Sequence, residues 1–287
     1  MKRHLRYMAI VVLILDVIAV AGLCVQRENP RVEAQAGPGR YAQLRASLRA
    51  SDPDHPLFRP ESWIYLDSGL AWEDETGHYV SSPARGGRLR VYPVANPGPP
   101  PRAKMRYLRT SEDSGIGRYG GIQVDWSQLV VASWRISFIP YSYFTARVSL
   151  GKSNYYGTGP FEQGSQGIGF RIAQGAFGPR LAGIAHNGGP QIDGHESVFL
   201  PLAPPPGVDI YTHSFTVTAV SFGDGAVEFI INDTSVGYAS SGGPLGYLSP
   251  VTGWGVGVRV EITNDDTYGD SYTDLVFNAA TIFVYEK

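Results

Sequence analysis

Two glutamates near the C-terminus are the candidates for acid–base chemistry. Glu261 lies in RVEIT, where Arg259 and Thr263 occupy the same polar face of a predicted strand, and Glu228 lies in VEFIIND. A glycoside hydrolase needs two carboxyl groups, and alternate positions on one strand place them on one face. Each glutamate is alone on its segment, and an arginine favours the charged form of a carboxylate, whereas a general acid must carry a proton. Both remain catalytic candidates only, and we expect Arg259 and Glu261 to form a cross-strand ion pair on a ligand-binding face.

Motifs for other chemistries are missing from the sequence. The six histidines include no pair at the short spacing of zinc ligands, and the single cysteine, Cys24, lies in the N-terminal apolar run. No G-x-S-x-G nucleophile elbow occurs, and no phosphate-binding glycine loop precedes a helix. The sequence therefore favours a protein that binds its ligand without transforming it and requires no cofactor. Glycoside hydrolysis stays open, because carboxylates from separate strands can meet on one face.

An acidic loop after RVEIT is a candidate cation site. The run NDDTYGDSYTD contains Asn264, Asp265, Asp266, Asp270 and Asp274 and no basic residue. Ca²⁺ takes six to eight oxygen ligands, so two or three of these carboxylates, with the asparagine and backbone carbonyls, could hold it. The spacing matches no defined calcium loop, and a solvated acidic loop that keeps the domain soluble explains the same residues.

A loop rich in tyrosine and glycine is a candidate carbohydrate-binding surface. The segment GKSNYYGTGPFEQGSQG contains Tyr155, Tyr156 and Phe161. Aromatic rings offer flat apolar surfaces on which a ligand can stack. The alternative is that these rings close one end of the core.

Strands must position these residues, because apolar and polar residues alternate with a period of two from residue 63 onward. The clearest case is residues 214–233, SFTVTAVSFGDGAVEFIIND, which predict a hairpin around Gly223-Asp224-Gly225. About twelve to fourteen strands are expected, and no helix of core length among them. Strands without helices bury their apolar faces by stacking two sheets, so the expected fold is all-β, a two-sheet antiparallel β-sandwich over residues 61–287. The other predicted strands are WIYLDSGL, RLRVYPV, KMRYLRT, IQVDW, WRISFIP, FTARVSL, GIGFRIA, RLAGIAHNGG, ESVFLPL, WGVGVRVEIT and LVFNAATIFVYEK.

The first sixty residues predict export. Lys2, Arg3 and Arg6 precede an apolar segment at residues 9–25, and a positive flank stays cytoplasmic while the following chain crosses the membrane. Residues 1–25 are thus a signal or signal-anchor segment with a hydrophobic helix, and Asp16 near its centre makes it a marginal anchor. Residues 26–60 are predicted to form a stalk with a short helix over residues 41–50. We expect the domain outside the cytoplasm, anchored to the membrane or secreted.

The charge distribution excludes nucleic acid as a partner. The chain holds 24 Lys/Arg and 26 Asp/Glu, of which the first fifty residues hold 8 and 3, so the remainder holds 16 and 23, a net charge of −7. Nucleic-acid binding draws most of its affinity from neutralising phosphates, which an acidic domain does not do. Within the domain, residues 85–118 carry 8 basic and 2 acidic residues, whereas residues 193–287 carry 2 and 12.

The order GIGFRI, LAGIAHNGG, SFTVTAV, VEFIIND and a terminal strand resembles the concanavalin A-like lectin/glucanase superfamily, particularly its laminin-G-like members, over roughly residues 167–287. The resemblance implies a jelly roll with a concave sheet face and with its first strands beside its last, so that basic and acidic segments become neighbours. The E-x-D-x-E motif of its laminarinase-like members is absent. Fold does not select among the family's functions. The hypothesis is an exported, membrane-tethered, non-catalytic carbohydrate-binding module whose partner is a glycan or another cell-surface component. The alternatives are a structural or assembly protein of the cell surface and a glycoside hydrolase.

Overall fold

The chain begins with a segment that the structure does not describe. No helix within the described ranges is long and apolar enough to cross a membrane, and the predicted segment at residues 9–25 lies outside them. The boundaries 1–25, 26–60 and 61–287 stay predictions. The computed structural model describes residues 39–65, 72–74, 79–80, 87–93, 104–110, 122, 124–140, 142–152, 166–175, 178–187, 199–209, 214–239, 256–266 and 272–285.

In the part of the chain that the structure describes, three helices precede the strand β1. The helix α2 spans Arg40–Ser51, where the sequence predicts one, and the 3-10 helices η1 and η2 span Pro56–Phe58 and Pro60–Ser62. Asp52-Pro53 follows α2, and a proline ring cannot continue a helix because it lacks the N–H donor. Each 3-10 helix instead begins with a proline, whose fixed φ suits a first helical position.

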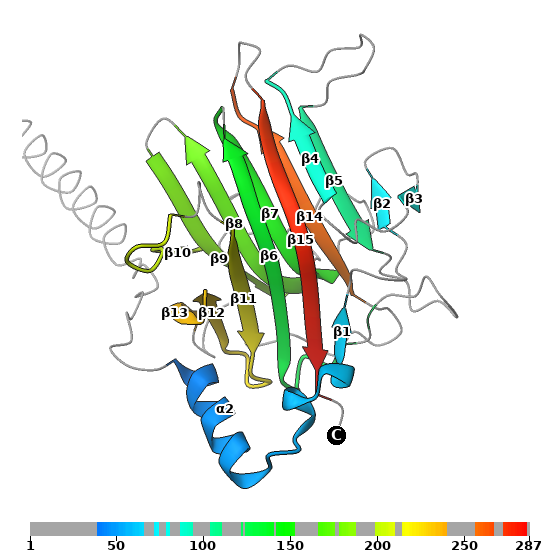
Figure 1. Ribbon diagram of the computed structural model, residues 1–287, viewed down its shortest axis with the longest axis vertical. Coiled ribbons are helices and arrows are strands. Elements are labelled where there is room, and N and C mark those ends of the chain that lie inside the picture. Colours follow the sequence, from blue (N-terminus) through cyan, green and yellow to red (C-terminus); the bar gives the residue numbers. More distant parts are fainter. Residues whose placement is uncertain are drawn as a thin grey trace, which may run out of the picture. The chain divides into compact units, whose positions relative to one another are not determined.

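Sheet A contains seven of the described strands (Figure 1). Their order is β1-β15-β6-β11-β12-β13, and β4 also pairs with β15. The pairings between these strands are all antiparallel. The strands are β1 (Trp63–Tyr65), β4 (Gly87–Val91), β6 (Val130–Pro140), β11 (Phe215–Ser221), β12 (Val227–Ile231), β13 (Thr234–Ala239) and β15 (Thr273–Val284).

Sheet B contains eight described strands and forms the second layer (Figure 1). Their order is β10-β9-β8-β7-β14-β5-β2-β3, again antiparallel. Two stacked antiparallel sheets confirm the predicted all-β sandwich. The strands are β2 (Trp72–Asp74), β3 (Tyr79–Val80), β5 (Met105–Thr110), β7 (Phe144–Lys152), β8 (Gln166–Gly175), β9 (Gly178–Asn187), β10 (Phe199–Leu202) and β14 (Gly257–Asn264).

The core lies between the facing sides of the two sheets. Trp134 and Phe229 of sheet A and Phe170 of sheet B are fully buried there. The rings of Phe170 and Phe229 meet edge to face, with centroids 5.4 Å apart. A Cβ at Gly183 of β9 would lie 2.6 Å from the Phe229 ring, so glycine at this position makes room for that ring between the sheets.

The predicted hairpin is formed by β11 and β12, with Val217 opposite Ile231. Gly223 and Gly225 in its turn both have φ of 82°, which side chains rarely adopt. Its alternation is confirmed, because the residues at the predicted apolar positions all enter the core. These are Phe215, Val217, Ala219, Val227, Phe229 and Ile231.

Some strand predictions are incomplete or wrong. The described residues of IQVDW form no strand. Ile122 makes an isolated bridge to Val256, and the backbone N–H of Gln128 donates to the carbonyl of Asp125 in a turn. The Asp125 carboxylate also accepts a bond from the backbone N–H of Ser127, and such local bonds compete with strand pairing. The strands β2, β3 and β13 were not predicted, because the first two have only three and two residues and TSVGYA lacks clear alternation.

The expected proximity of early and late strands is confirmed, since β1 and β4 both pair with β15 and β5 pairs with β14. Opposite charges meet at one of these pairings. Arg90 on β4 donates to both carboxylate oxygens of Asp274 on β15, at 2.7 and 2.8 Å, and the Arg88 Nε lies 3.5 Å from the same group. The Asp274 side chain is fully buried, so these basic residues neutralise a charge that has no access to water.

Candidate functional site

The outward side of sheet B carries polar and charged side chains. On β14 the buried residues Val258, Val260 and Ile262 point into the core, so Arg259 and Glu261 point the other way. The same alternation on the neighbouring strands defines one continuous surface, which we call the B face. Its polar members with described side chains include Tyr107 of β5, Arg147 of β7, Arg171 of β8, Arg180 of β9, and Arg259 and Glu261 of β14.

One row of residues crosses the B face from strand to strand. Glu261 is the partner of Tyr107 on one side and of Arg147 on the other, and Arg147 is in turn the partner of Arg171. The row continues through Ala182 to Pro201 of β10. Adjacent strands lie about 4.8 Å apart, so the row extends over roughly 24 Å. A surface of this length matches an extended ligand better than a single small molecule.

The centre of the B face is a buried ion pair. The Nε and Nη2 atoms of Arg259 donate to Oε2 of Glu261 at 3.0 and 2.7 Å, and both side chains are 8% exposed. The predicted pair therefore exists, but within one strand. The cross-strand contact is made by Arg147, whose Nη1 lies 3.6 Å from Oε1 of Glu261. The Arg259 guanidinium also lies over the aromatic ring of Tyr107, with its central carbon 4.4 Å from the ring centroid.

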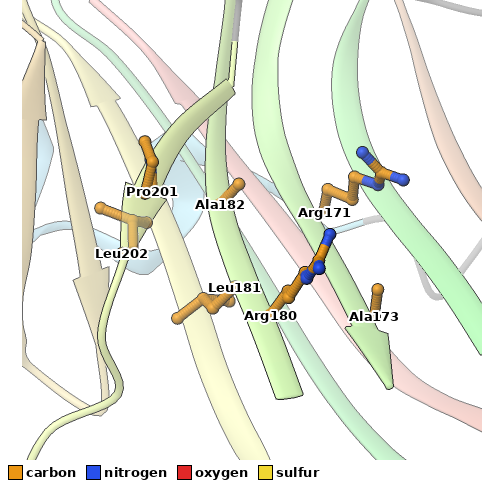
Figure 2. Close-up of a pocket in the computed structure, with 7 residues that line it drawn as sticks. All are labelled: Arg171, Ala173, Arg180, Leu181, Ala182, Pro201 and Leu202. Atoms are coloured by element: carbon orange, nitrogen blue, oxygen red, sulfur yellow. The ribbon is translucent and has the colours of Figure 1, made fainter. Parts of the chain in front are cut away.

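A cavity opens at the β10 end of the B face (Figure 2). Its volume is about 320 Å³. Figure 2 shows Arg171 and Arg180 extending on the same side of β8 and β9, beside small and apolar side chains. Arg180 is exposed and Arg171 is half-buried. The lining residues are Arg171, Ala173, Arg180, Leu181, Ala182, Pro201 and Leu202.

The other candidate glutamate lies on the opposite sheet. Glu228 is fully buried on β12, and its Oε2 accepts a hydrogen bond from the backbone N–H of Tyr41 at 2.7 Å. Tyr41 is in the first turn of α2, where unpaired backbone donors and the helix dipole attract a negative charge. Glu228 therefore attaches α2 to sheet A. The structure does not bring it together with Glu261.

The described carboxylates of the acidic loop, those of Asp265, Asp266 and Asp274, are each held by a different partner. Asp265 accepts a bond from the Thr145 hydroxyl, Asp266 accepts one from the backbone N–H of Tyr143, and Asp274 pairs with Arg90. The Asn264 amide donates to Ser142. No group of three candidate metal ligands occurs in the parts of the chain that are described. Asp270 lies outside them, as do the aromatic residues Tyr155, Tyr156 and Phe161.

Sequence reasoning found Arg259 and Glu261 but missed the rest of the B face. Arg147, Arg171 and Arg180 stand at polar positions of the predicted strands FTARVSL, GIGFRIA and RLAGIAHNGG. Their alternation with apolar residues was the available signal, since it places each arginine on the outward side of its strand. The order and register of the strands bring these arginines together, and neither could be predicted from the sequence.

No protein-family model and no curated protein matches this sequence. Solved structures do match it. The potassium-bound carbohydrate recognition domain of Emp46p is 10% identical, with a TM-score of 0.45 over 79% of this chain and 90% of that chain. The Crh5 transglycosylase in complex with NAG is 14% identical, with a TM-score of 0.47 over 78% and 85%. The family 7 alginate lyase A1-II' in complex with the substrate GGMG is 9% identical, with a TM-score of 0.47 over 76% and 93%.

Each match is a similarity of backbone arrangement. The sheet topology by itself agrees with the resemblance to concanavalin A-like sandwiches at the level of the fold. The Emp46p domain itself is known in both a potassium-bound and a metal-free form.

Proposed function

We propose that this protein is an exported, membrane-tethered, non-catalytic carbohydrate-binding module, and that the B face is its binding surface. The observation that supports this proposal is the cross-strand row from Tyr107 to Pro201, which combines arginines, an aromatic ring and a cavity. Planar guanidinium groups and aromatic rings suit a ligand that has both polar groups and an apolar face, as a sugar ring has.

The opposite outer surface, that of sheet A, is a poorer candidate. Part of it is covered by α2 and η1, which contribute Tyr41 and Leu57 to a buried cluster with Val220 and Phe283. A ligand could reach these positions only by displacing the helix. The B face instead presents half-buried and exposed arginines at a cavity.

The placement of the carboxylates supports binding without hydrolysis. Glu261 is held by Arg259 and approached by Arg147, so both of its carboxylate oxygens lie against guanidinium groups of the protein itself. Glu228 attaches α2 to the other sheet. The two glutamates therefore do not form the pair that flanks a scissile glycosidic bond.

A binding experiment with a blocking variant tests this proposal. Full-length protein in a non-ionic detergent would be exposed to a panel of immobilised neutral and acidic polysaccharides, and released reducing ends would be measured. We expect binding of at least one class without cleavage. Ala173→Trp, which fills the cavity, should weaken that binding at least tenfold, whereas Ala46→Trp on the exposed side of α2 should not. Failure to bind any member, or cleavage of the bound polysaccharide, would refute the proposal.

Export and tethering rest on the N-terminal sequence. Lys2, Arg3 and Arg6 before the apolar residues 9–25 favour a cytoplasmic N-terminus and an external domain. Protease added to intact cells should degrade the domain, and a carbonate wash should leave it in the membrane fraction. Release of the domain by the wash would favour a secreted protein, and protection in intact cells would contradict export.

A further inference from the structure

Beyond the part of sheet A that α2 and η1 cover, the outward side of this sheet carries arginines. Phe283, which packs beneath these helices, lies at the C-terminal end of β15, whereas β4 pairs with residues 273–277 at the start of that strand. On β4, Leu89 enters the core, so Arg88 and Arg90 on either side of it point outward. We call this outward surface the A face. Its members include Arg88 and Arg90 of β4, Asp274 and Val276 of β15, and Arg135 and Ser137 of β6.

The one carboxylate among these six residues is already held by an arginine. Asp274 is fully buried, and both of its oxygens accept hydrogen bonds from Arg90, at 2.7 and 2.8 Å. Arg88 lies at the edge of this pair, because its Nε is 3.5 Å from Asp274 and its side chain is 53% exposed. One carboxylate therefore faces two guanidinium groups, which leaves one positive charge in excess on the more exposed arginine.

Arg135 adds a further positive charge on β6. Trp134 and Ile136 on either side of it are fully buried in the core, so the Arg135 side chain points outward, where it is exposed. Its Nε donates to the hydroxyl of Ser214, a neutral partner, at 3.4 Å. Among the residues that the structure describes, no carboxylate lies within ion-pair distance of Arg135. A guanidinium group has five N–H donors, so Arg88 and Arg135 both keep donors that a ligand can use.

The register of the sheet places Arg88 and Arg135 on two sides of a small apolar area. Arg88 is the partner of Val276, which is in turn the partner of Ser137 on β6. Arg135 lies two residues before Ser137 and is the partner of Ala279. Two strand spacings of about 4.8 Å and two residues of about 3.4 Å put the Cα atoms of the two arginines roughly 12 Å apart. Their guanidinium groups end long flexible stems, so both can reach one group that lies above Val276.

Two guanidinium groups that approach from different sides suit a tetrahedral anion. A carboxylate has two oxygens in one plane, and a single arginine can occupy both, as Arg90 does with Asp274. A phosphate or sulfate ester presents oxygens in several directions, so each arginine can bind a different one. The arrangement on the A face therefore matches an ester of this kind better than a carboxylate.

We propose that the A face is a second binding surface, which holds a phosphate or sulfate ester of an anionic cell-surface polymer between Arg88 and Arg135. The A face and the B face lie on different sheets. This second surface is therefore independent of the carbohydrate binding proposed for the B face. A domain with a ligand on each sheet connects two components of the cell surface. Phosphate and sulfate esters share the same recognition chemistry, so the experiment distinguishes them.

The test uses polymers without sugar rings, so that the carbohydrate binding proposed for the B face does not contribute. Full-length protein in a non-ionic detergent would be titrated with poly(glycerol phosphate), poly(vinyl sulfate), polyacrylate and poly(vinyl alcohol). We expect at least one of the two ester polymers to bind, and the tighter of them identifies the ester. Polyacrylate and poly(vinyl alcohol) should bind at least about tenfold more weakly than that polymer. Raising the salt from 0.05 to 0.5 M should weaken the ester complex, because salt screens the attraction.

Three double variants locate the site. Arg88→Gln with Arg135→Gln should reduce affinity for the ester polymer at least about tenfold. Arg45→Gln with Arg59→Gln removes the same charge from exposed positions elsewhere and should change affinity less than about twofold. Arg88→Lys with Arg135→Lys keeps the charge but not the forked donors, and should bind at least about threefold more weakly than the wild type. Arg88 and Arg135 are exposed, so the first variant should melt within about 3 °C of the wild type.

The outcomes separate this inference from the carbohydrate binding proposed above. Failure to bind either ester polymer, or polyacrylate binding as tightly as the esters, would overturn the ligand class. Equal losses in the two glutamine variants, or wild-type affinity in the lysine variant, would overturn the site. Ala173→Trp, which blocks the cavity of the B face, should leave ester binding unchanged, and a loss there would overturn the independence of the two surfaces. A protein that binds the ester polymer but no polysaccharide would support this inference and refute the function proposed for the B face.

Discussion

The outer surfaces of the two sheets are built from the same alternation but differ in what covers them. On sheet A the outward positions of β6, β11, β12 and β15 include Val131, Val220, Ile230 and Phe283, which are buried in a cluster with residues of α2 and η1. On sheet B the corresponding positions are Arg259, Glu261 and the other residues of the B face. Apolar outward residues favour covering by the chain's own helices, since this removes apolar area from water.

The two buried glutamates differ in the same way. Glu228 accepts a backbone hydrogen bond at the first turn of α2 and so connects two parts of the chain. Glu261 is paired with an arginine on its own strand and lies 3.6 Å from Arg147 of the neighbouring strand, both on the B face. One buried carboxylate thus stabilises architecture, and the other shapes a charged surface.

The largest effect on the free energy of unfolding is expected from a substitution that disrupts the packing on the outer surface of sheet A. Phe283 is fully buried beneath the helices, with its ring centroid 5.4 Å from that of Trp63. Phe283→Ala should lower the free energy of unfolding by about 3 to 5 kcal/mol, because it leaves a cavity. Tyr65→Ala on the adjacent strand, where the residue is 47% exposed, should change it by less than about 0.5 kcal/mol. Urea unfolding measures both, and similar values would contradict the structural role assigned to this surface.

The next effect concerns the ion pair of the B face. Glu261→Gln leaves Arg259 buried beside Arg147 without a carboxylate to pair with. The free energy of unfolding should therefore fall by about 3 kcal/mol. The same change removes a carboxylate from the B face and should alter the affinity for a polysaccharide that binds there. Glu61→Gln, at an exposed position, is the control for both measurements. A stable Glu261→Gln variant would show that the pair is not needed for folding.

A smaller effect tests the attachment of α2. Glu228→Ala removes the acceptor for the Tyr41 N–H and should cost about 2 kcal/mol, with Asp54→Ala as an exposed control. Gly39→Ala should act in the same direction, because an added Cβ would collide with Oε1 of Glu228. Hydrogen exchange should accelerate in α2 and stay slow in the strands of sheet B. Equal acceleration of hydrogen exchange in α2 and in the strands of sheet B would mean that Glu228 stabilises the whole domain and not the attachment of α2 in particular.

The smallest expected effect is a pH-dependent change in the free energy of unfolding, and it comes from Asp224 in the turn between β11 and β12 of sheet A. Burial, the largest single influence, would raise the pKa of Asp224, but the hydrogen bonds from Arg40 and from the backbone N–H of Ala226, together with the positive charge of Arg40, outweigh burial and lower it. A carboxyl whose folded pKa is depressed stabilises the fold above its unfolded pKa, about 3.9, and loses that contribution as pH falls through the folded value. Both side chains are more than a third exposed, at 39% and 47%, so screening limits the contribution to less than about 1 kcal/mol.

Asp224→Asn tests this contribution. The difference in unfolding free energy between wild type and variant should be small at pH 7 and should shrink toward pH 3. A difference that grows as the pH falls would contradict the assigned direction of the pKa shift.

Much of the fold could be predicted from local patterns. The hairpin of residues 214–233 was readable because its apolar residues alternate on both sides of a glycine-rich turn, and this alternation records which side faces the core. The segment IQVDW shows the limit of this reasoning, because the turn at Asp125 replaced the strand. Strands of two or three residues, such as β2 and β3, are too short to show a period.

The sequence by itself determined the fold class, the outward position of each arginine and the acidic balance of the domain, because these follow from residue types and their spacing. Only the tertiary structure decided that β7, β8 and β9 are neighbours, with Arg147 opposite Arg171 and Arg180 diagonal to it. It also decided that Glu228 and Glu261 lie on different sheets. The physical reason is that alternation specifies the two sides of a strand but not its pairing partner, which is selected by packing of the whole core.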